Sequence, residues 1–148
     1  MPNGLIVVGL DGSESSKEAL RWAARQARLT NAALRAVIAW HLPTNYGWPV
    51  PPYPELDFEA DARKILDQAI DEALGPDRPD DLDTKVIEGH PAAVLVGAAA
   101  DADLLVVGSR GHGAFAGMLL GSVSEHCVHQ ATCPVLVERG GSAGEATP

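Results

Sequence analysis

An apolar run leads directly into a glycine-rich segment in the stretch Asp103-Leu104-Leu105-Val106-Val107-Gly108-Ser109-Arg110-Gly111-His112-Gly113. A short, continuous run of Leu and Val is typical of a strand that is buried on both faces of a parallel sheet. The glycines lack a Cβ atom, so their backbone can adopt a positive φ and let a ligand approach the amides closely. The stretch therefore predicts a parallel α/β sheet with a candidate ligand loop after one of its strands.

Strand and helix patterns alternate on both sides of this stretch. Short apolar runs predict five strands, over residues 5–10, 34–40, 84–88, 103–108 and 134–138. Apolar residues at helical spacing predict four helices, after residues 13–16, over 56–74, over 92–100 and from about residue 121. This alternation indicates the α/β class, with an open five-stranded parallel sheet and helices on both faces. Such sheets bind ligands beyond the carboxyl ends of their strands, which here are the segments 9–12 and 108–113.

Two serines stand at capping-box spacing from a glutamate: Ser15 precedes Glu18 by three residues, and Ser122 precedes Glu125 in the same way. This spacing predicts that each serine caps the start of a helix. The helix that begins near Gly121 would then present free N–H groups and a positive dipole end to the glycine-rich loop, which is a typical phosphate site. The same residues also fit a tight turn and a capped helix without a ligand.

The composition favours one small globular domain. The chain has 148 residues and a mass of 15.5 kDa, and we expect a single domain over residues 1–139 with a disordered tail over 140–148.

A net charge of −9 without a basic block argues against general nucleic-acid binding. The N-terminus lacks a basic region, and the apolar run over 92–100 is about half of what a membrane span needs. These features predict a soluble, cytoplasmic protein that binds no membrane.

The sequence lacks the motifs of several other kinds of active site. The sequence contains no G-x-x-x-x-G-K-[ST] phosphate loop and no G-x-S-x-G nucleophile motif. Asp11 follows the first strand, but no motif pairs it with a nucleophile, so we predict no dedicated catalysis. His41 and His90 carry no signal beyond their loop positions.

His126 and His129 lie close to Cys127 and Cys133 in the sequence, which raises the question of a zinc site. Their spacing fits no common zinc pattern, so we predict two surface histidines and two reduced, partly buried thiols.

Residues 43–54 contain five prolines and no periodicity, and they predict a long surface loop. The sequence leaves open whether that loop is a lid, a partner surface or simply solvated.

The spacing Gly108-x2-Gly111-x9-Gly121-Ser122 resembles the ATP-binding signature of the universal stress protein family. Three further segments match the family: Val7-Val8-Gly9-Leu10-Asp11-Gly12-Ser13, Gly89-His90-Pro91 and Cys133-Pro134-Val135-Leu136-Val137. The resemblance implies the Rossmann-like, adenine nucleotide alpha hydrolase-like form of the fold and the branch of the family that binds ATP. It also implies Mg²⁺ on the phosphates, a nucleotide-responsive regulatory role in the stress response, and at most slow ATP hydrolysis.

Carrying the family's site over residue by residue implies three groups of contacts. Gly9 and Asp11 would lie against the adenosine, with Ala39 in the adenine pocket. Residues 108–113 would wrap the ribose and phosphates, and the start of the last helix would donate amide and hydroxyl hydrogen bonds to the phosphates. Relatives often have glycine in place of Ala114, a small departure that leaves the spacing intact. The implied binding set is Gly9, Asp11, Ala39, Gly108, Ser109, Arg110, Gly111, His112, Gly113, Ala114, Gly121, Ser122, Val123 and Ser124.

The resemblance also concerns partners. The family commonly dimerises through its last strand, and Val135-Leu136-Val137 would suit such a pairing, so we predict a homodimer. The signalling partner is not identified by the sequence.

Two alternative functions are compatible with the same fold: a sensor or sink for cyclic AMP or AMP, and a slow ATPase or adenylyl-transfer hydrolase. Helices rich in alanine and arginine indicate a bacterial source.

Overall fold

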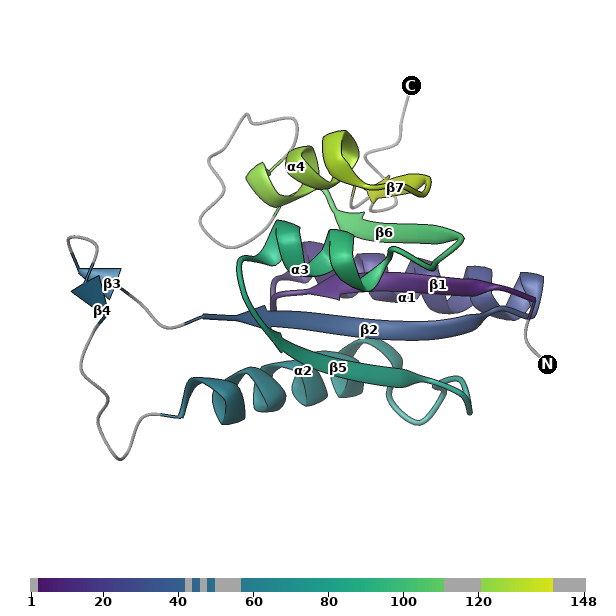
Figure 1. Ribbon diagram of the computed structural model, residues 1–148. Helices are drawn as coiled ribbons and strands as arrows, with labels where there is room; N and C mark the ends of the chain where they lie inside the picture. The colour runs from purple at the N-terminus through teal and green to yellow at the C-terminus, as the bar shows by residue number, and fades with distance from the viewer. Residues whose placement is uncertain (1–2, 42–43, 46–47, 50–56, 111–120, 140–148) are drawn as a thin grey trace, which may run out of the picture.

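The computed structural model describes residues 3–41, 44–45, 48–49, 57–110 and 121–139 (Figure 1). The predicted tail over 140–148 lies outside these residues, as does part of the glycine-rich loop. Among the residues described, no helix combines the length and the apolar character needed to cross a bilayer. The elements follow one another in the order β1 (Leu5–Leu10), α1 (Glu14–Thr30), β2 (Ala33–Trp40), β3 (Thr44–Asn45), β4 (Trp48–Pro49), α2 (Phe58–Leu74), β5 (Asp83–Glu88), α3 (Pro91–Ala98), β6 (Leu104–Gly108), α4 (Ser122–Gln130) and β7 (Val135–Glu138).

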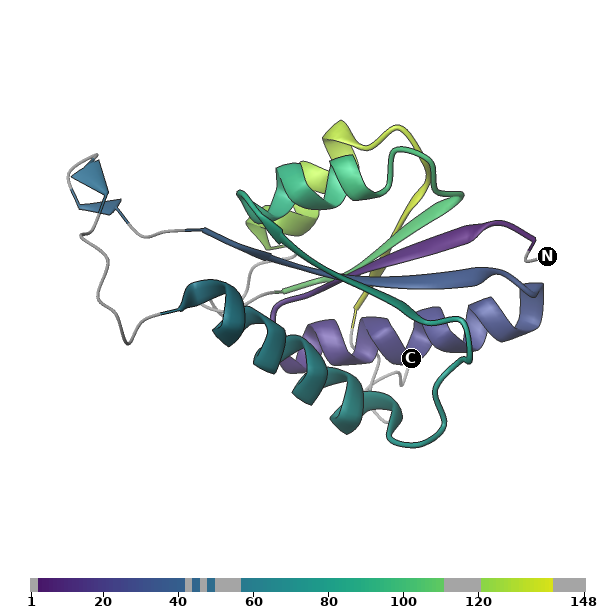
Figure 2. The same cartoon turned by 60° about the horizontal axis from the view of Figure 1, so that its bottom comes forward.

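The longer strands form one parallel sheet in the spatial order β5-β2-β1-β6-β7. Helices α1 and α2 cover one face of this sheet, and α3 and α4 cover the other (Figure 2). The prediction of an open five-stranded parallel sheet with helices on both faces is therefore confirmed. From β1 the chain first extends the sheet through β2 to β5, and it then crosses back to add β6 and β7 on the other side. The carboxyl ends of β1 and β6 consequently form the topological switch point.

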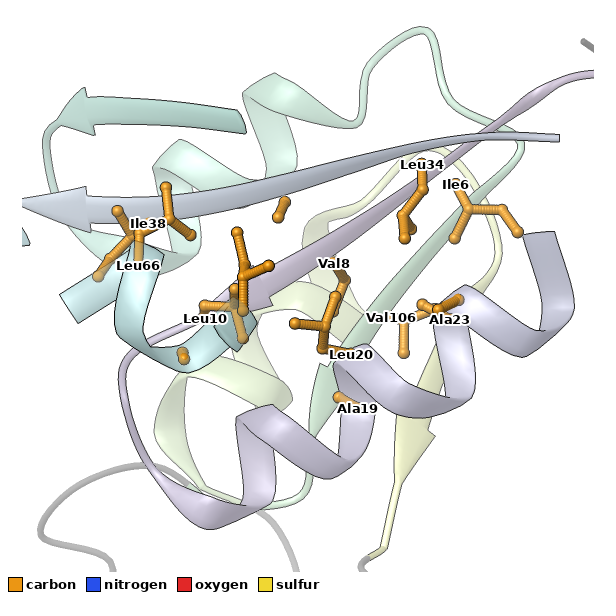
Figure 3. Packing of buried hydrophobic residues seen from close by; sticks show 14 of the residues in the cluster. Ile6, Val8, Leu10, Ala19, Leu20, Ala23, Leu34, Ile38, Leu66 and Val106 are labelled. Atoms are coloured by element: carbon orange, nitrogen blue, oxygen red, sulfur yellow. The ribbon is translucent and has the colours of Figure 1, made fainter. Parts of the chain in front are cut away.

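Side chains alternate between the two faces along the central strands. Ile6, Val8 and Leu10 of β1 are buried against α1 and α2, whereas Val7 is buried on the side of α3 and α4. Figure 3 shows the first group pointing toward Leu20 of α1. Because helices cover both faces, apolar side chains are needed on both, and the strands read as continuous apolar runs.

Helix α1 starts earlier than the capping-box spacing predicts. Ser13 is the N-cap, and its side-chain oxygen accepts a hydrogen bond from the Ser16 N–H at 3.1 Å, so the prediction of a Ser15 cap is wrong. Gly12 has a φ of 86°, a left-handed conformation that turns the chain sharply directly after Asp11. This turn places Ser15 inside the first helical turn, where its hydroxyl accepts a hydrogen bond from the Arg110 N–H at 3.2 Å.

The proline-rich segment after β2 contains a short hairpin. Strands β3 and β4 pair in antiparallel fashion, with Thr44 opposite Pro49 and Asn45 opposite Trp48. The prediction of a loop without regular structure over residues 43–54 is therefore wrong for these four residues. A two-stranded ribbon has only edge strands, and an edge strand tolerates a proline that cannot donate a hydrogen bond. Residues 43, 46–47 and 50–54 of this segment lie outside the described part of the chain.

A buried lysine joins α1 to α2. The Lys17 side chain is only 9% exposed, and its Nζ lies 2.6 Å from a carboxylate oxygen of Glu14 and 2.6 Å from one of Glu72. These two hydrogen bonds raise the pKa of Lys17, and the bond from Lys17 lowers the pKa of Glu72. The Lys17 ammonium and the Glu72 carboxylate are therefore charged at neutral pH, and their ion pair holds α2 beside the first turn of α1.

We expect Gly108→Ala and Gly97→Ala to have opposite effects on stability. A Cβ atom on Gly108 would lie 2.8 Å from the Ser15 carbonyl carbon and oxygen, which belong to the α1 backbone, so the free energy of unfolding should fall by about 2–3 kcal/mol. A Cβ atom on Gly97 in α3 would meet nothing within 4 Å, and alanine is the better helix former, so stability should rise by about 0.5–1 kcal/mol. Urea unfolding followed by circular dichroism measures both changes, and equal effects of the two variants would contradict this packing.

Candidate functional site

A cleft opens at the carboxyl ends of β1 and β6, at the switch point of the sheet. The strand ends contribute part of its lining, and the first turns of α1, α3 and α4 contribute the rest. Parallel α/β sheets bind their ligands at this edge, so the position of the cleft makes it the candidate site. Its lining residues are Gly9, Leu10, Asp11, Ser16, Pro91, Leu95, Val107, Gly108, Arg110, Val123 and Ser124.

The first turn of α4 is held directly against the end of β6. The Gly121 N–H donates to the Ser109 carbonyl at 2.6 Å, and the Ser124 hydroxyl donates to the Gly108 carbonyl. Gly121 is the N-cap, with φ −73° and ψ 164°, and no side chain caps the helix, so the predicted cap by Ser122 is wrong. Ser122 is already the first helical residue, and its own N–H is one of the amides that need a partner. The leading amides of α4 have no acceptor within the helix, and the positive end of the helix dipole lies there.

Two glycines at the cleft allow helices to pack closely on the strand ends. A Cβ atom on Gly9 would lie 2.5 Å from Cδ1 of Leu95 in α3, and one on Gly108 would run into Ser15 in α1. The sequence pattern predicts that these glycines let a ligand approach the backbone. The structure gives them a second role, because a Cβ atom at Gly108 would meet the α1 backbone and one at Gly9 would displace the Leu95 side chain.

The turn between β1 and α1 fixes the position of Asp11. The Asp11 carboxylate accepts a hydrogen bond from the Ser13 N–H at 2.9 Å, and its own N–H donates to the Ser16 hydroxyl at 3.3 Å. Asp11 is exposed, whereas Ser16 is buried. The turn therefore holds an acidic side chain at the cleft, within reach of solvent and of a bound ligand.

The cleft combines apolar side chains with hydrogen-bond donors. Leu95, Val107 and Val123 provide apolar surface, and the leading amides of α4 provide donors. Arg110 lines the same cleft and is exposed, so its positive charge is available to an anion. This combination suits a ligand that has an anionic group at one end and an apolar or aromatic group at the other.

A model of the universal stress protein family matches residues 3–139. The chain belongs to the universal stress protein family. A member of the family from Mycolicibacterium smegmatis is 38% identical over 143 residues, which cover 91% of this chain and 48% of that protein. Universal stress protein Rv2005c of Mycobacterium tuberculosis is 37% identical over 138 residues, which cover 89% of this chain and 46% of that protein. The chain thus spans about half the length of the curated relatives that it matches.

A solved structure of a universal stress protein in complex with cAMP is 33% identical to this chain. The two superimpose with a TM-score of 0.68, over 92% of this chain and 96% of the other. The predicted membership of the family and the predicted Rossmann-like fold are both confirmed by these comparisons.

The structure brings together several of the residues that the sequence predicts for the family's site. Those that line the cleft are Gly9, Asp11, Gly108, Arg110, Val123 and Ser124. Ser109 is buried beside it, and Gly121 and Ser122 begin the helix whose first turn lines it. Which of these residues touch a ligand stays a prediction.

Other predicted residues lie elsewhere. Ala39 is half-buried in β2, packs on the core between the sheet and the α3–α4 layer, and does not line the cleft. Gly111, His112, Gly113 and Ala114 lie outside the described residues.

Helix α3 also contributes to the cleft, which the sequence pattern does not predict. Pro91 and Leu95 line the cleft because β5 feeds α3 across the sheet toward β6. The segment Gly89-His90-Pro91 carried a usable signal, since it directly follows a strand. Its place beside the cleft depends on the strand order, which the local sequence does not encode.

The two cysteines are free thiols in different environments. Cys127 in α4 is completely buried, whereas Cys133 is half-buried. His126 and His129 are exposed, as predicted, but Cys127 is more deeply buried than predicted. Burial raises the pKa of the Cys127 thiol to about 11, and it also raises the pKa of Cys133. Within the described part of the chain, no group of three or more His, Cys, Asp or Glu side chains is placed to hold a metal ion.

We expect Cys127 to resist thiol reagents at pH 8. With a pKa of about 11, only a small fraction of the thiol is ionised, so alkylation should be at least about 100-fold slower than for a free cysteine. A Cys133→Ser variant isolates Cys127, and mass spectrometry after iodoacetamide treatment measures its rate. Unfolding in urea serves as the control, since it should restore rapid labelling. Rapid labelling of the folded variant would show that Cys127 is accessible.

We expect Ser124→Ala to destabilise the fold more than Ser122→Ala. The first change removes the donor to the buried Gly108 carbonyl and should lower the free energy of unfolding by about 1–2 kcal/mol. The second removes an exposed hydroxyl from the same helical turn and should change stability by less than about 0.5 kcal/mol. Thermal unfolding of the two variants measures the difference, and similar Tm values would argue against the Ser124 bond.

Proposed function

We propose that the protein binds ATP in the cleft, with Mg²⁺ on the phosphates, and acts as a nucleotide-responsive regulator in the stress response. The observation that carries this proposal is the placement of the α4 N-terminus. The bonds from Gly121 to Ser109 and from Ser124 to Gly108 hold the first turn of α4 at the carboxyl end of β6. Amides that are held in place at a helix N-terminus are ready to bind phosphate oxygens.

The remaining groups of the cleft match the other parts of ATP. Leu95 and Val107 offer apolar surface to the base and sugar, and the Asp11 carboxylate offers acceptors to ribose hydroxyls. Arg110 offers a positive charge to the phosphates. Mg²⁺ prefers oxygen ligands and retains several waters, so it would be held mainly by the phosphates themselves.

Relatives support an adenine nucleotide as the ligand. The 33% identical structure is a universal stress protein in complex with cAMP. Cyclic AMP shares its base and sugar with ATP but carries one phosphate, and it is the second candidate ligand here. The base can make the same contacts in either case, but the 3′ oxygen of cAMP is esterified, so only its 2′-hydroxyl could donate to Asp11. The two ligands also differ in the number of phosphates that could reach α4.

The regulatory part of the proposal rests on the connection between the cleft and the edge strand β7. The Ser109 N–H donates to the Glu138 carbonyl at 2.9 Å, and the Ser109 carbonyl accepts from Gly121. A nucleotide that orders the start of α4 would therefore also stabilise the end of β7. Because β7 forms an edge of the sheet, a second copy of the chain could pair along Val135-Leu136-Val137 as a homodimer. The nucleotide would shift the population toward one partner-competent state.

The first test identifies the nucleotide that accompanies the purified protein. Protein prepared without added nucleotide is denatured, and the released small molecules are identified by liquid chromatography with mass spectrometry. We expect ATP at close to one molecule per chain. Release of cAMP instead, or displacement of ATP by equimolar cAMP in calorimetry, would favour the second candidate.

A matched pair of variants tests the role of the α4 N-terminus. Asp and Asn are equally good N-cap residues and are similar in size, so Gly121→Asp and Gly121→Asn differ mainly in charge. We expect Gly121→Asp to weaken ATP binding at least about tenfold more than Gly121→Asn, because its carboxylate repels the phosphates. Isothermal titration calorimetry measures both affinities. Equal affinities would place the phosphates elsewhere, and a native protein that neither releases nor binds a nucleotide would refute the proposal.

A further inference from the structure

Two histidine rings lie together at the carboxyl ends of neighbouring strands. His41 directly follows β2, and His90 lies two residues beyond the end of β5. Their ring centroids are 5.1 Å apart, with a tilt of 45° between the ring planes, and both residues are exposed. Neither residue belongs to the lining of the nucleotide cleft.

Hydrogen bonds hold the backbone that leads into each histidine. Trp40 is paired with Glu88 in the parallel ladder of β2 and β5, and the Gly89 N–H extends the ladder by donating to the Trp40 carbonyl at 2.7 Å. His90 is the N-cap of α3, and its carbonyl accepts from Val94 at 2.9 Å, but its side chain makes no capping hydrogen bond. These hydrogen bonds hold the backbone that carries the two imidazoles, and the His90 ring is not needed to cap α3.

The distance between the two ring centroids is compatible with both rings binding one metal ion. A metal ion lies about 2.0–2.1 Å from an imidazole nitrogen, and therefore roughly 3.2 Å from the ring centroid. With an angle between about 90° and 109° at the metal, as in octahedral or tetrahedral coordination, two such rings have their centroids about 4.5–5.2 Å apart. The observed 5.1 Å falls within this range. Each imidazole has two ring nitrogens, so one can bind an ion while the other keeps a hydrogen-bond partner.

We propose that His41 and His90 form a two-histidine site for a divalent transition-metal ion of the nickel, copper and zinc group. Imidazole nitrogen is a preferred ligand of these ions, whereas Mg²⁺ and Ca²⁺ prefer oxygen. Water completes the coordination, so the ion exchanges readily. The net charge of −9 favours the approach of a cation.

Metal binding would connect two parts of the fold. The ion bridges the ends of β2 and β5, so it binds the folded chain more tightly than the unfolded one and stabilises it. His90 also immediately precedes Pro91, which lines the nucleotide cleft. The inference does not depend on the proposed ATP site, because it rests on the histidine pair alone and is tested without nucleotide.

Titration of the protein with Zn²⁺ tests the site, with chain that carries no histidine tag and has been treated with a chelator. We expect one Zn²⁺ per chain in calorimetry and a rise in Tm of the native protein. His41→Gln and His90→Gln should each weaken binding at least tenfold and abolish the rise in Tm. His129→Gln is the matched control, since it removes an exposed histidine of α4 that shares no pocket with His90, and it should bind Zn²⁺ as the native chain does.

Electron paramagnetic resonance with Cu²⁺ gives an independent measure of the ligands. Superhyperfine splitting should indicate two imidazole nitrogens in the native protein and in His129→Gln, but one in His41→Gln. Unchanged Zn²⁺ affinity in His41→Gln and His90→Gln would overturn the proposal, as would loss of binding in His129→Gln instead.

Discussion

The contact of Gly108 with two helix starts is the constraint on which the candidate site depends. Its carbonyl accepts the Ser124 hydroxyl of α4, and the absence of a side chain lets Ser15 of α1 pack against it. The first turns of two helices on opposite faces of the sheet therefore meet at the end of one strand. This meeting point creates the cleft and fixes the leading amides of α4 inside it. A larger residue at this position would separate α1 from β6 and disrupt the packing of the two helix starts.

An acidic protein that binds a polyanion must do so with groups that carry little net charge. The chain has a net charge of −9, which opposes phosphate at long range. Backbone amides at a helix start act at short range, where their fixed orientation gives charge-assisted hydrogen bonds to phosphate oxygens. Arg110 is the cationic side chain in the lining of the cleft. The local arrangement of α4 therefore matters more for a nucleotide than the overall charge, and the same overall charge favours cations at the His41–His90 pair.

The cleft and the histidine pair lie at the same edge of the sheet for a common reason. Parallel strands direct their carboxyl ends to one edge, and the segments that follow them gather there. Helix α3 takes part in both features, because His90 occupies its N-cap position while Pro91 and Leu95 line the cleft. An ion at His90 and a nucleotide in the cleft would thus meet the same helix from two sides.

The sequence by itself determined the α/β class and the five parallel strands, because a strand covered on both faces must be apolar on both. The spacing of its glycines also predicted the family and several of the residues that line the cleft. It did not determine the helix starts: Ser13 rather than Ser15 caps α1, and Gly121 rather than Ser122 is the N-cap of α4. Nearby polar residues are locally equivalent as caps, and the left-handed turn at Gly12 and the Ser109 carbonyl select among them. Only the tertiary structure placed Leu95 at the cleft and His41 beside His90, because strand order decides which distant segments become neighbours and no local pattern encodes it.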